Sequence, residues 1–202
     1  MKYILDFDRV LFDTDRFSAD LKSHGLGDMS RNHELLDAVT TAGLKWEAYV
    51  YPGVIDFLSQ NGDRCEIVSS YISFYRGDNT EDEATLEHFQ TEKIIRCGIK
   101  KMVHEVHLTN EDKTETLLEI RQQCSEPLVY IDDSPAQIRA VSELGYDHVV
   151  WFATARELFT NPNPESGPSF VTETFAEVEH VTSFEAFVNS VTSWKRQSEQ
   201  ST

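Results

Sequence analysis

Residues Ile4–Leu11 read ILDFDRVL, and this stretch decides the fold. It closes a short apolar run, Lys2–Phe7, that turns acidic, which is typical of a buried strand leading into a polar loop. Asp6 and Asp8 are two residues apart, so in an extended chain both carboxylates point to the same side. Because acids often simply end a strand or cap a turn, the motif needs support from elsewhere in the chain.

Further apolar segments alternate with segments of helical spacing. Four more strands are predicted at Arg64–Ser69, Glu105–Thr109, Pro127–Asp132 and Asp147–Phe152. Between them, helices are predicted at Val54–Gln60, Glu81–Val103, Lys113–Gln123 and Pro135–Leu144. This alternation predicts an α/β fold, a Rossmann-like three-layer sandwich whose central parallel sheet has its site at the carboxyl ends of the strands.

One segment near the amino terminus departs from the alternation. Residues 15–51 contain two helical patterns, Arg16–His24 and Arg31–Leu44, joined by a turn rich in glycine. We predict a small helical cap over residues 15–51, inserted into a core domain of residues 1–14 and 52–202. Within the last part of the core, Thr160–Ser169 is predicted to be a loop, followed by an edge strand in Phe170–Val181 and a helix over Ser183–Trp194.

Composition limits the function. The 202 residues include 18 basic and 35 acidic side chains, a formal charge of −17 that argues against nucleic-acid binding. No apolar run approaches the roughly 20 residues that a bilayer needs, and the start lacks the features of a signal peptide, so we expect a cytoplasmic protein without a membrane partner. The three cysteines form no CxxC pair and are expected to be reduced. The oligomeric state stays open.

Polar groups recur where predicted strands end. Ser69 and Ser70 end the second strand, and Asp132 and Asp133 end the fourth. If the first and fourth strands are neighbours, four carboxylates converge there with those of the first motif, and their mutual repulsion would raise some pKa values unless a cation joined them. Ligands that offer only oxygen suit a hard cation, so the sequence favours Mg²⁺.

Lys113 adds a separate signal. It lies in the first turn of a predicted helix, where the helix dipole disfavours a cation, so an anionic partner would explain it. The alternative is an exposed lysine paired with nearby glutamates. Lys93 and Lys100 are other candidates for the same role.

In this order the residues resemble the motifs of the haloacid dehalogenase superfamily of aspartate-nucleophile phosphatases. Residues 6–10 (DFDRV) resemble its first motif, Ser69 the second, Lys113 the third and Asp132–Asp133 the fourth. The segment Tyr51–Leu58 is similar to the one that re-enters the core after a cap. The resemblance covers Lys2–Phe152, with one departure at Arg9, where many relatives carry glycine.

The resemblance implies a role for each matched residue. Asp6 would attack phosphorus, and Asp8 would act as acid and base. Ser69 and Lys113 would be catalytic and would also bind the phosphoryl group. Substrate contacts are further expected from Ser70 and Arg9. The Mg²⁺ ligands would come from Asp6, Asp8 (through its backbone carbonyl), Asp132 and Asp133, with Asp133 favoured as the direct ligand.

These features predict a magnesium-dependent phosphatase that hydrolyses a small phosphomonoester through an aspartyl-phosphate. Three alternatives are weighed against it. A phosphomutase or phosphonate hydrolase would use the same core with an added cap residue such as Lys22 or Lys45. A dehalogenase is disfavoured because halide departure needs no acid at Asp8. A non-catalytic regulatory binding module is the least economical reading of an intact motif set.

Overall fold

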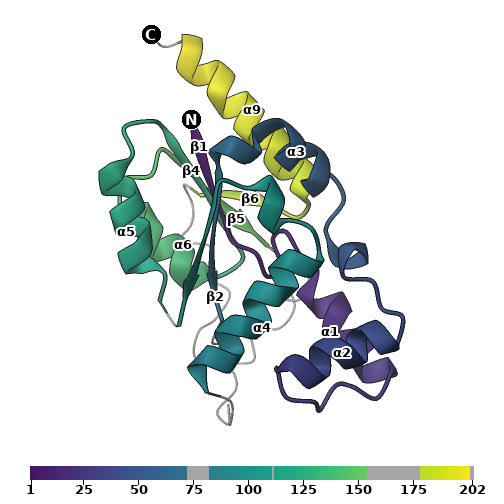
Figure 1. The fold of residues 1–202 in the computed structure, drawn as a ribbon. Helices are drawn as coiled ribbons and strands as arrows, with labels where there is room; N and C mark the ends of the chain where they lie inside the picture. The colour runs from purple at the N-terminus through teal and green to yellow at the C-terminus, as the bar shows by residue number, and fades with distance from the viewer. Residues whose placement is uncertain (72–81, 111, 154–177, 201–202) are drawn as a thin grey trace, which may run out of the picture.

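The computed structural model describes residues 1–71, 82–110, 112–153 and 178–200. Its centre is a parallel sheet in the order β3-β2-β1-β4-β5-β6 (Figure 1). The described strands are β1 (Lys2–Leu5), β2 (Cys65–Ser70), β3 (Glu105–Thr109), β4 (Leu128–Asp132), β5 (His148–Phe152) and β6 (Glu179–Val181). Because β1 pairs with both β2 and β4, the residues that follow β1 lie between the ends of its two neighbours.

Helices cover both faces of this sheet (Figure 1). The described α-helices are α1 (Thr14–Ser23), α2 (His33–Thr41), α3 (Val54–Asn61), α4 (Glu83–Arg96), α5 (Thr114–Gln123), α6 (Pro135–Ser142) and α9 (Phe184–Gln200). Buried side chains of α3, α4 and α9 share one apolar cluster, whereas those of α5 and α6 belong to a second. The predicted three-layer α/β sandwich with a central parallel sheet is therefore confirmed.

Strand β1 shows how the two cores are divided. Its side chains alternate, so Tyr3 and Leu5 enter the first cluster and Ile4 enters the second. All three are buried, which is why the strand is apolar throughout. The first polar side chain after this run is Asp6, placed at the carboxyl edge of the sheet.

The segment between β1 and α3 carries α1 and α2 outside the sheet (Figure 1). Aromatic rings hold it to the core: the Phe17 ring of α1 lies 5.4 Å from that of Phe12 and 4.9 Å from that of Trp46. Tyr49 packs against the same two phenylalanines. The aromatic residues at the end of this segment thus serve as packing.

Most element boundaries fall within two residues of the predicted ones, and three helices differ more. The helix predicted over Arg31–Leu44 ends three residues early, at Thr41. The helix predicted over Glu81–Val103 ends at Arg96, because Gly98 adopts φ +82° and stops it. Helix α9 runs to Gln200, six residues past its predicted end at Trp194. The predicted edge strand is present as β6, and the predicted loop Thr160–Ser169 lies outside the described residues.

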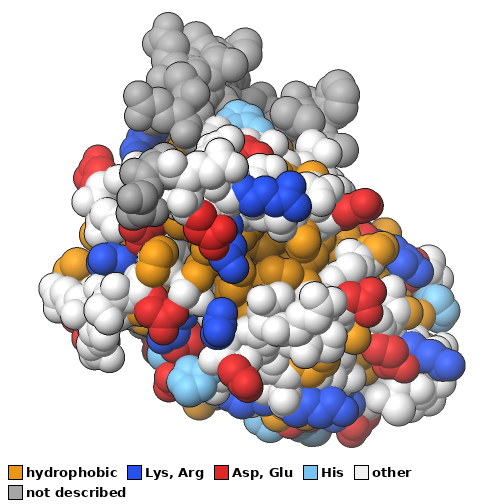
Figure 2. Space-filling model, turned by 90° about the horizontal axis from the view of Figure 1, so that it is seen from above, with side chains coloured by type: hydrophobic (Ala, Val, Ile, Leu, Met, Phe, Trp, Pro, Cys, Tyr) orange, Lys and Arg blue, Asp and Glu red, His pale blue; other side chains and the backbone are white. Residues whose placement is uncertain are grey.

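The surface is mixed in character. Figure 2 shows hydrophobic side chains gathered in a hollow on the face seen from above, with charged side chains of both signs around it. Among the described residues, no helix is both apolar and long enough to span a bilayer.

The packing of α9 against α3 gives a first prediction. Phe187 is fully buried and contacts the rings of Phe57 and Phe184. Phe187→Ala should lower the free energy of unfolding by about 3–5 kcal/mol, because it leaves a cavity in the first core cluster. Ile55→Ala on α3, where the side chain is 43% exposed, should change it far less. Urea denaturation compares the two, and equal losses would show that α9 does not belong to the core.

Candidate active site

Three carboxylates meet where β1 and β4 end. Leu5 pairs with Ile131, and the Asp6 amide donates to the Ile131 carbonyl at 3.0 Å. This register sets Asp6 beside Asp132 and Asp133, whose carboxylate oxygens and that of Asp6 all lie within 4.8 Å of one another. All three residues are buried. The parallel pairing of two distant strands therefore assembles the acidic group.

Lys113 enters this group from the start of α5. Its Nζ lies 2.6 Å from Asp6 Oδ1 and 2.7 Å from Asp132 Oδ2. Asp132 is further held by the Tyr130 hydroxyl at 2.5 Å and by the Ser134 amide at 2.7 Å. Although burial alone would lower the pKa of Lys113, the charges of Asp132 and Asp6 raise it, so Lys113 is a cation. Asp132 thus orients the ammonium group toward Asp6.

The neighbouring carboxylates at this edge affect the pKa of Asp6. Burial raises the pKa of Asp6 well above its usual range; Asp132 and Asp133 raise it further, while Lys113 lowers it. A divalent cation beside these oxygens would relieve that repulsion. The donor set is carboxylate oxygen alone, which fits Mg²⁺. Since both Asp132 oxygens already accept hydrogen bonds, Asp6 and Asp133 are the better placed direct ligands.

The Asp8 carboxylate points to a different set of partners. It accepts hydrogen bonds from Thr14 Oγ1 and Gln90 Nε2, the latter at 2.6 Å, and forms an ion pair with Lys93. Burial alone would raise the pKa of Asp8, but Lys93 and these hydrogen bonds outweigh it and lower the pKa to about 2. Asp8 is therefore ionised. Four carboxylates were predicted to converge at this edge, but only those of Asp6, Asp132 and Asp133 form the close group among the described residues.

Lys93 is a buried cation on α4. Its ammonium nitrogen lies 4.7 Å from the centre of the Phe12 ring and 5.2 Å from that of Phe7. Both aromatic faces favour a cation at this distance. Lys93 is thus fixed on two sides, by rings and by the Asp8 carboxylate.

The two serines at the end of β2 differ in their contacts. Ser69 is buried, and its Oγ accepts a hydrogen bond from Gln90 Nε2 at 3.1 Å. Gln90 therefore joins Ser69 to Asp8. Ser70 is less buried and donates from Oγ to the Asn110 carbonyl at 3.3 Å.

Arg9 occupies a strained position next to the acids. Its φ of 62° lies in the left-handed region, which favours glycine and costs another residue about 1 kcal/mol. Its guanidinium lies 3.3 Å from Asp133 Oδ2 and 3.3 Å from Asp15 Oδ1. These ion pairs offset the strain, and they place a cation at the rim of the acidic group.

Sequence reasoning named Lys93 only as an alternative to Lys113, and it missed Gln90. Lys113 contacts Asp6, Lys93 contacts Asp8, and Lys100 is exposed. One signal was present: the buried face of α4 reads Leu86, Phe89, Gln90, Lys93, Ile94, so two polar residues sit in an apolar stripe. A buried lysine or glutamine in such a stripe requires a polar partner.

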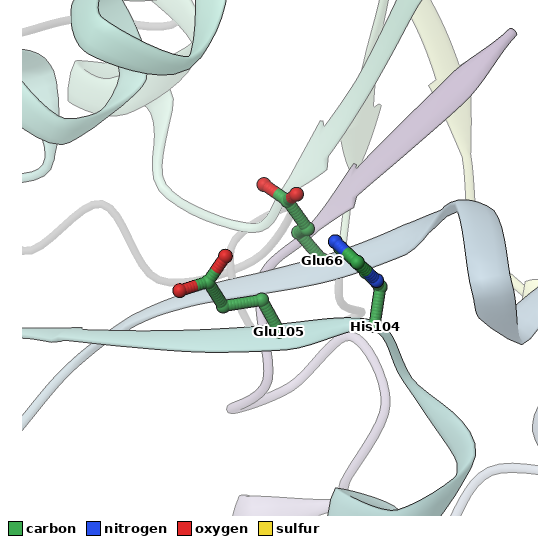
Figure 3. A group of neighbouring side chains, drawn as sticks. All are labelled: Glu66, His104 and Glu105. Atoms are coloured by element: carbon green, nitrogen blue, oxygen red, sulfur yellow. The ribbon is translucent and has the colours of Figure 1, made fainter.

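A second charged cluster lies at the opposite, amino edge of the sheet. Glu66, His104 and Glu105 have ligand atoms within 4.8 Å of one another (Figure 3). The buried Glu66 carboxylate, however, already pairs with Lys2 and lies 3.3 Å from His107 Nε2. Glu66 and Glu105 therefore belong to an ion-pair network with Lys2 and His107, and we assign no metal to it.

The predicted site residues line one cavity of about 560 Å³. Its floor is the carboxyl edge of the sheet. All eight residues that were predicted to be catalytic, substrate-binding or metal-binding line the cavity: Asp6, Asp8, Arg9, Ser69, Ser70, Lys113, Asp132 and Asp133. Its other walls come from the segment with α1 and α2 and from α4. The cavity is large enough for a phosphoryl group together with an organic substituent.

Fold and site together define a Rossmann-like α/β protein with carboxylates and a lysine at the carboxyl edge of a parallel sheet. No protein-family model matches the sequence, and no curated protein matches it. Among solved structures, a haloacid dehalogenase-like hydrolase from Burkholderia xenovorans is similar, with a TM-score of 0.62, 19% identity and coverage of 95% of this chain and 96% of the other. A hydrolase of the haloacid dehalogenase-like family from Streptococcus pneumoniae gives a TM-score of 0.51 at 13% identity, covering 93% and 97%. The chain therefore has the fold of the haloacid dehalogenase superfamily.

The Asp8–Lys93 pair gives a second prediction. Lys93→Met leaves a mostly buried carboxylate without its cation, and should lower the free energy of unfolding by roughly 2–4 kcal/mol. In an Asp8→Asn background the same change should cost less by about 1 kcal/mol or more, because the uncompensated charge is gone. Denaturation of the four proteins in metal-free buffer measures the coupling. Additive losses would mean that the two side chains do not interact.

The ion pairs of Glu66 with Lys2 and His107 at the amino edge of the sheet give a third prediction. Burial would raise the pKa of Glu66, but His107 and Lys2 lower it below its usual value. A depressed carboxyl pKa stabilises the fold above the unfolded pKa of about 4.5, and this contribution is lost as the pH falls through the folded value. Glu66→Gln should therefore cost roughly 1–3 kcal/mol at pH 7 and progressively less below pH 4.5. A penalty independent of pH would rule out the ion-pair interpretation.

Proposed function

We propose that this protein is a hydrolase that uses Mg²⁺ to cleave a small phosphomonoester, with Asp6 as nucleophile. The observation that carries the proposal is the buried contact of Lys113 with both Asp6 and Asp132, beside Asp133. Such an arrangement offers a carboxylate oxygen for attack and a fixed positive charge for the transferring phosphoryl oxygens.

In the first step an Asp6 oxygen forms a bond to phosphorus while the bond from phosphorus to the ester oxygen breaks. The leaving oxygen takes a proton from Asp8. In the second step a water oxygen bonds to phosphorus, the bond to Asp6 breaks, and Asp8 accepts the proton from water. The products are an alcohol and inorganic phosphate, and Asp6 and Asp8 end as they began.

The environment of Asp8 favours the second of these roles in the free protein. With a pKa of about 2 it is a carboxylate, which is the protonation state that can accept a proton from water, although so low a pKa makes it a weak base. A bound phosphoryl group brings negative charge to the same cavity, which raises the pKa of Asp8 toward values at which it can carry the proton for the first step. Lys93, Gln90 and Thr14 keep the carboxylate in place for both steps.

We assign the metal to Asp6, Asp133 and the Asp8 backbone carbonyl, with Asp132 holding Lys113. Bound Mg²⁺ would supply charge stabilisation for the phosphoryl oxygens. Ser69 and Ser70 lie at the end of the adjacent strand, where their hydroxyl or amide groups can bind phosphate. Arg9 lies within the same cavity as a further anion-binding group. The proposal includes a cytoplasmic setting and residues 15–51 as the cap.

A phosphomutase or phosphonate hydrolase on the same core is the second candidate. Phosphonate cleavage through a Schiff base needs a lysine that reaches the cavity. Lys22 lines it, whereas Lys45 is exposed and is not among the described residues of its walls. Lys22→Met separates the two activities: it would abolish phosphonate cleavage and spare the hydrolysis of a small phosphate ester. Halide release without phosphate release would instead show a dehalogenase.

The decisive measurement is phosphate release with Mg²⁺, using acetyl phosphate and a panel of phosphomonoesters. Asp6→Asn keeps the shape of the side chain but removes the nucleophile, so turnover should fall about a thousandfold or more. Chelation of Mg²⁺ should give a similar loss in the parent protein. Glu143→Gln, outside the cavity, serves as the matched acid-to-amide control and should retain full activity. An active Asp6→Asn would disprove the proposed nucleophile.

A further inference from the structure

The cavity has two chemically different parts. At the sheet edge it presents carboxylates, hydroxyls and the Lys113 ammonium group. The wall made by α1, α2, their connecting loop and α4 has a large apolar part: Phe17 and Leu21 of α1, Leu26 and Met29 of the loop, Leu35 of α2 and Phe89 of α4. The polar side chains of this wall are Thr14, Gln90 and Lys93, which contact Asp8, and Ser18, Lys22 and Arg31.

A phosphoryl group seated at the acidic end would direct its organic substituent toward the apolar walls. A hydroxyl moved from water into such a space loses hydrogen bonds that few wall groups can replace. An apolar ring gains from the same transfer in proportion to the area that leaves water. Lys22 and Arg31 on this wall disfavour a positively charged substituent.

We propose that the residues of α1, α2, their connecting loop and α4 form a subsite for an apolar leaving group, so that the substrate class is aryl and cycloalkyl phosphomonoesters. This inference rests on the proposed function and specifies its substrate class. Sugar phosphates, whose hydroxyls would face these apolar side chains, are poor substrates.

Cyclohexyl phosphate and an inositol monophosphate make a matched pair, because each carries one phosphate on a six-membered carbon ring. The hydroxyls of inositol make its alkoxide the better leaving group, so intrinsic reactivity favours inositol phosphate. The subsite should reverse this order and give cyclohexyl phosphate a kcat/KM higher by about tenfold or more. An equal or higher kcat/KM for inositol phosphate overturns the proposal.

Met29→Gln makes one wall polar at nearly constant volume. It should lower kcat/KM for cyclohexyl phosphate by about threefold to tenfold, and affect acetyl phosphate, which carries no ring, far less. Ile55→Gln is the control, since Ile55 is an exposed apolar residue on α3, outside the cavity. Equal losses in both variants, or no loss in either, count against the subsite.

Binding separates this inference from the proposed function. Calorimetric titration of Asp6→Asn with the two ring phosphates in Mg²⁺ requires no turnover. If acetyl phosphate is not hydrolysed by the parent protein but cyclohexyl phosphate binds Asp6→Asn about tenfold more tightly than inositol phosphate, the subsite stands and the proposed hydrolysis fails. If acetyl phosphate is hydrolysed and the two ring phosphates bind equally, the hydrolysis stands and the subsite fails.

Discussion

Buried negative charge at the carboxyl edge of the sheet is the constraint on which the rest of this structure depends. Ionised carboxylates are expensive to bury unless a cation or hydrogen-bond donors accompany them. Each acid at this edge has a cationic partner from another element: Lys113 at the start of α5 for Asp6 and Asp132, Lys93 on α4 for Asp8, and Arg9 in the loop after β1 for Asp133. These ion pairs therefore connect the carboxyl edge of the sheet with the start of α5 and with α4.

Arg9 takes part in this pairing at a backbone cost. Arg9 holds a backbone conformation suited to glycine, which adds strain at the loop that carries Asp8. In return its guanidinium contacts Asp133 and Asp15, the second of which lies at the start of α1. The residue links the proposed metal ligand to the first helix outside the sheet. Replacement by glycine would relieve the strain but leave two carboxylates less well compensated.

The sequence predicts those features that a local pattern of residues determines, such as a strand and the acids that follow it. Asp6 and Asp8 follow strand β1 because an apolar strand must give way to polar residues at the sheet edge, and the same reasoning located Asp132 and Asp133. The partners of Asp8 could not be found in this way. Lys93 reaches Asp8 over 85 positions of sequence, and the contact depends on how α4 is rotated about its axis against β1. Only the structure fixes that rotation, although two polar residues on an apolar helical face gave a sign of it.

The chemistry of the cavity is tied to the packing that holds α1 and α2 in place. Phe17 contributes to the cavity wall and also packs against Phe12 and Trp46, while Phe89 lines the cavity and contacts Trp46. Making this wall polar would therefore remove apolar contacts that stabilise the segment on the core. The residues of the floor must stay polar, because the buried acids and the cations there stabilise one another. The polar floor is therefore required by the ion pairs, and the apolar wall by the packing of α1 and α2 on the core. A ligand of the cavity has to match both surfaces.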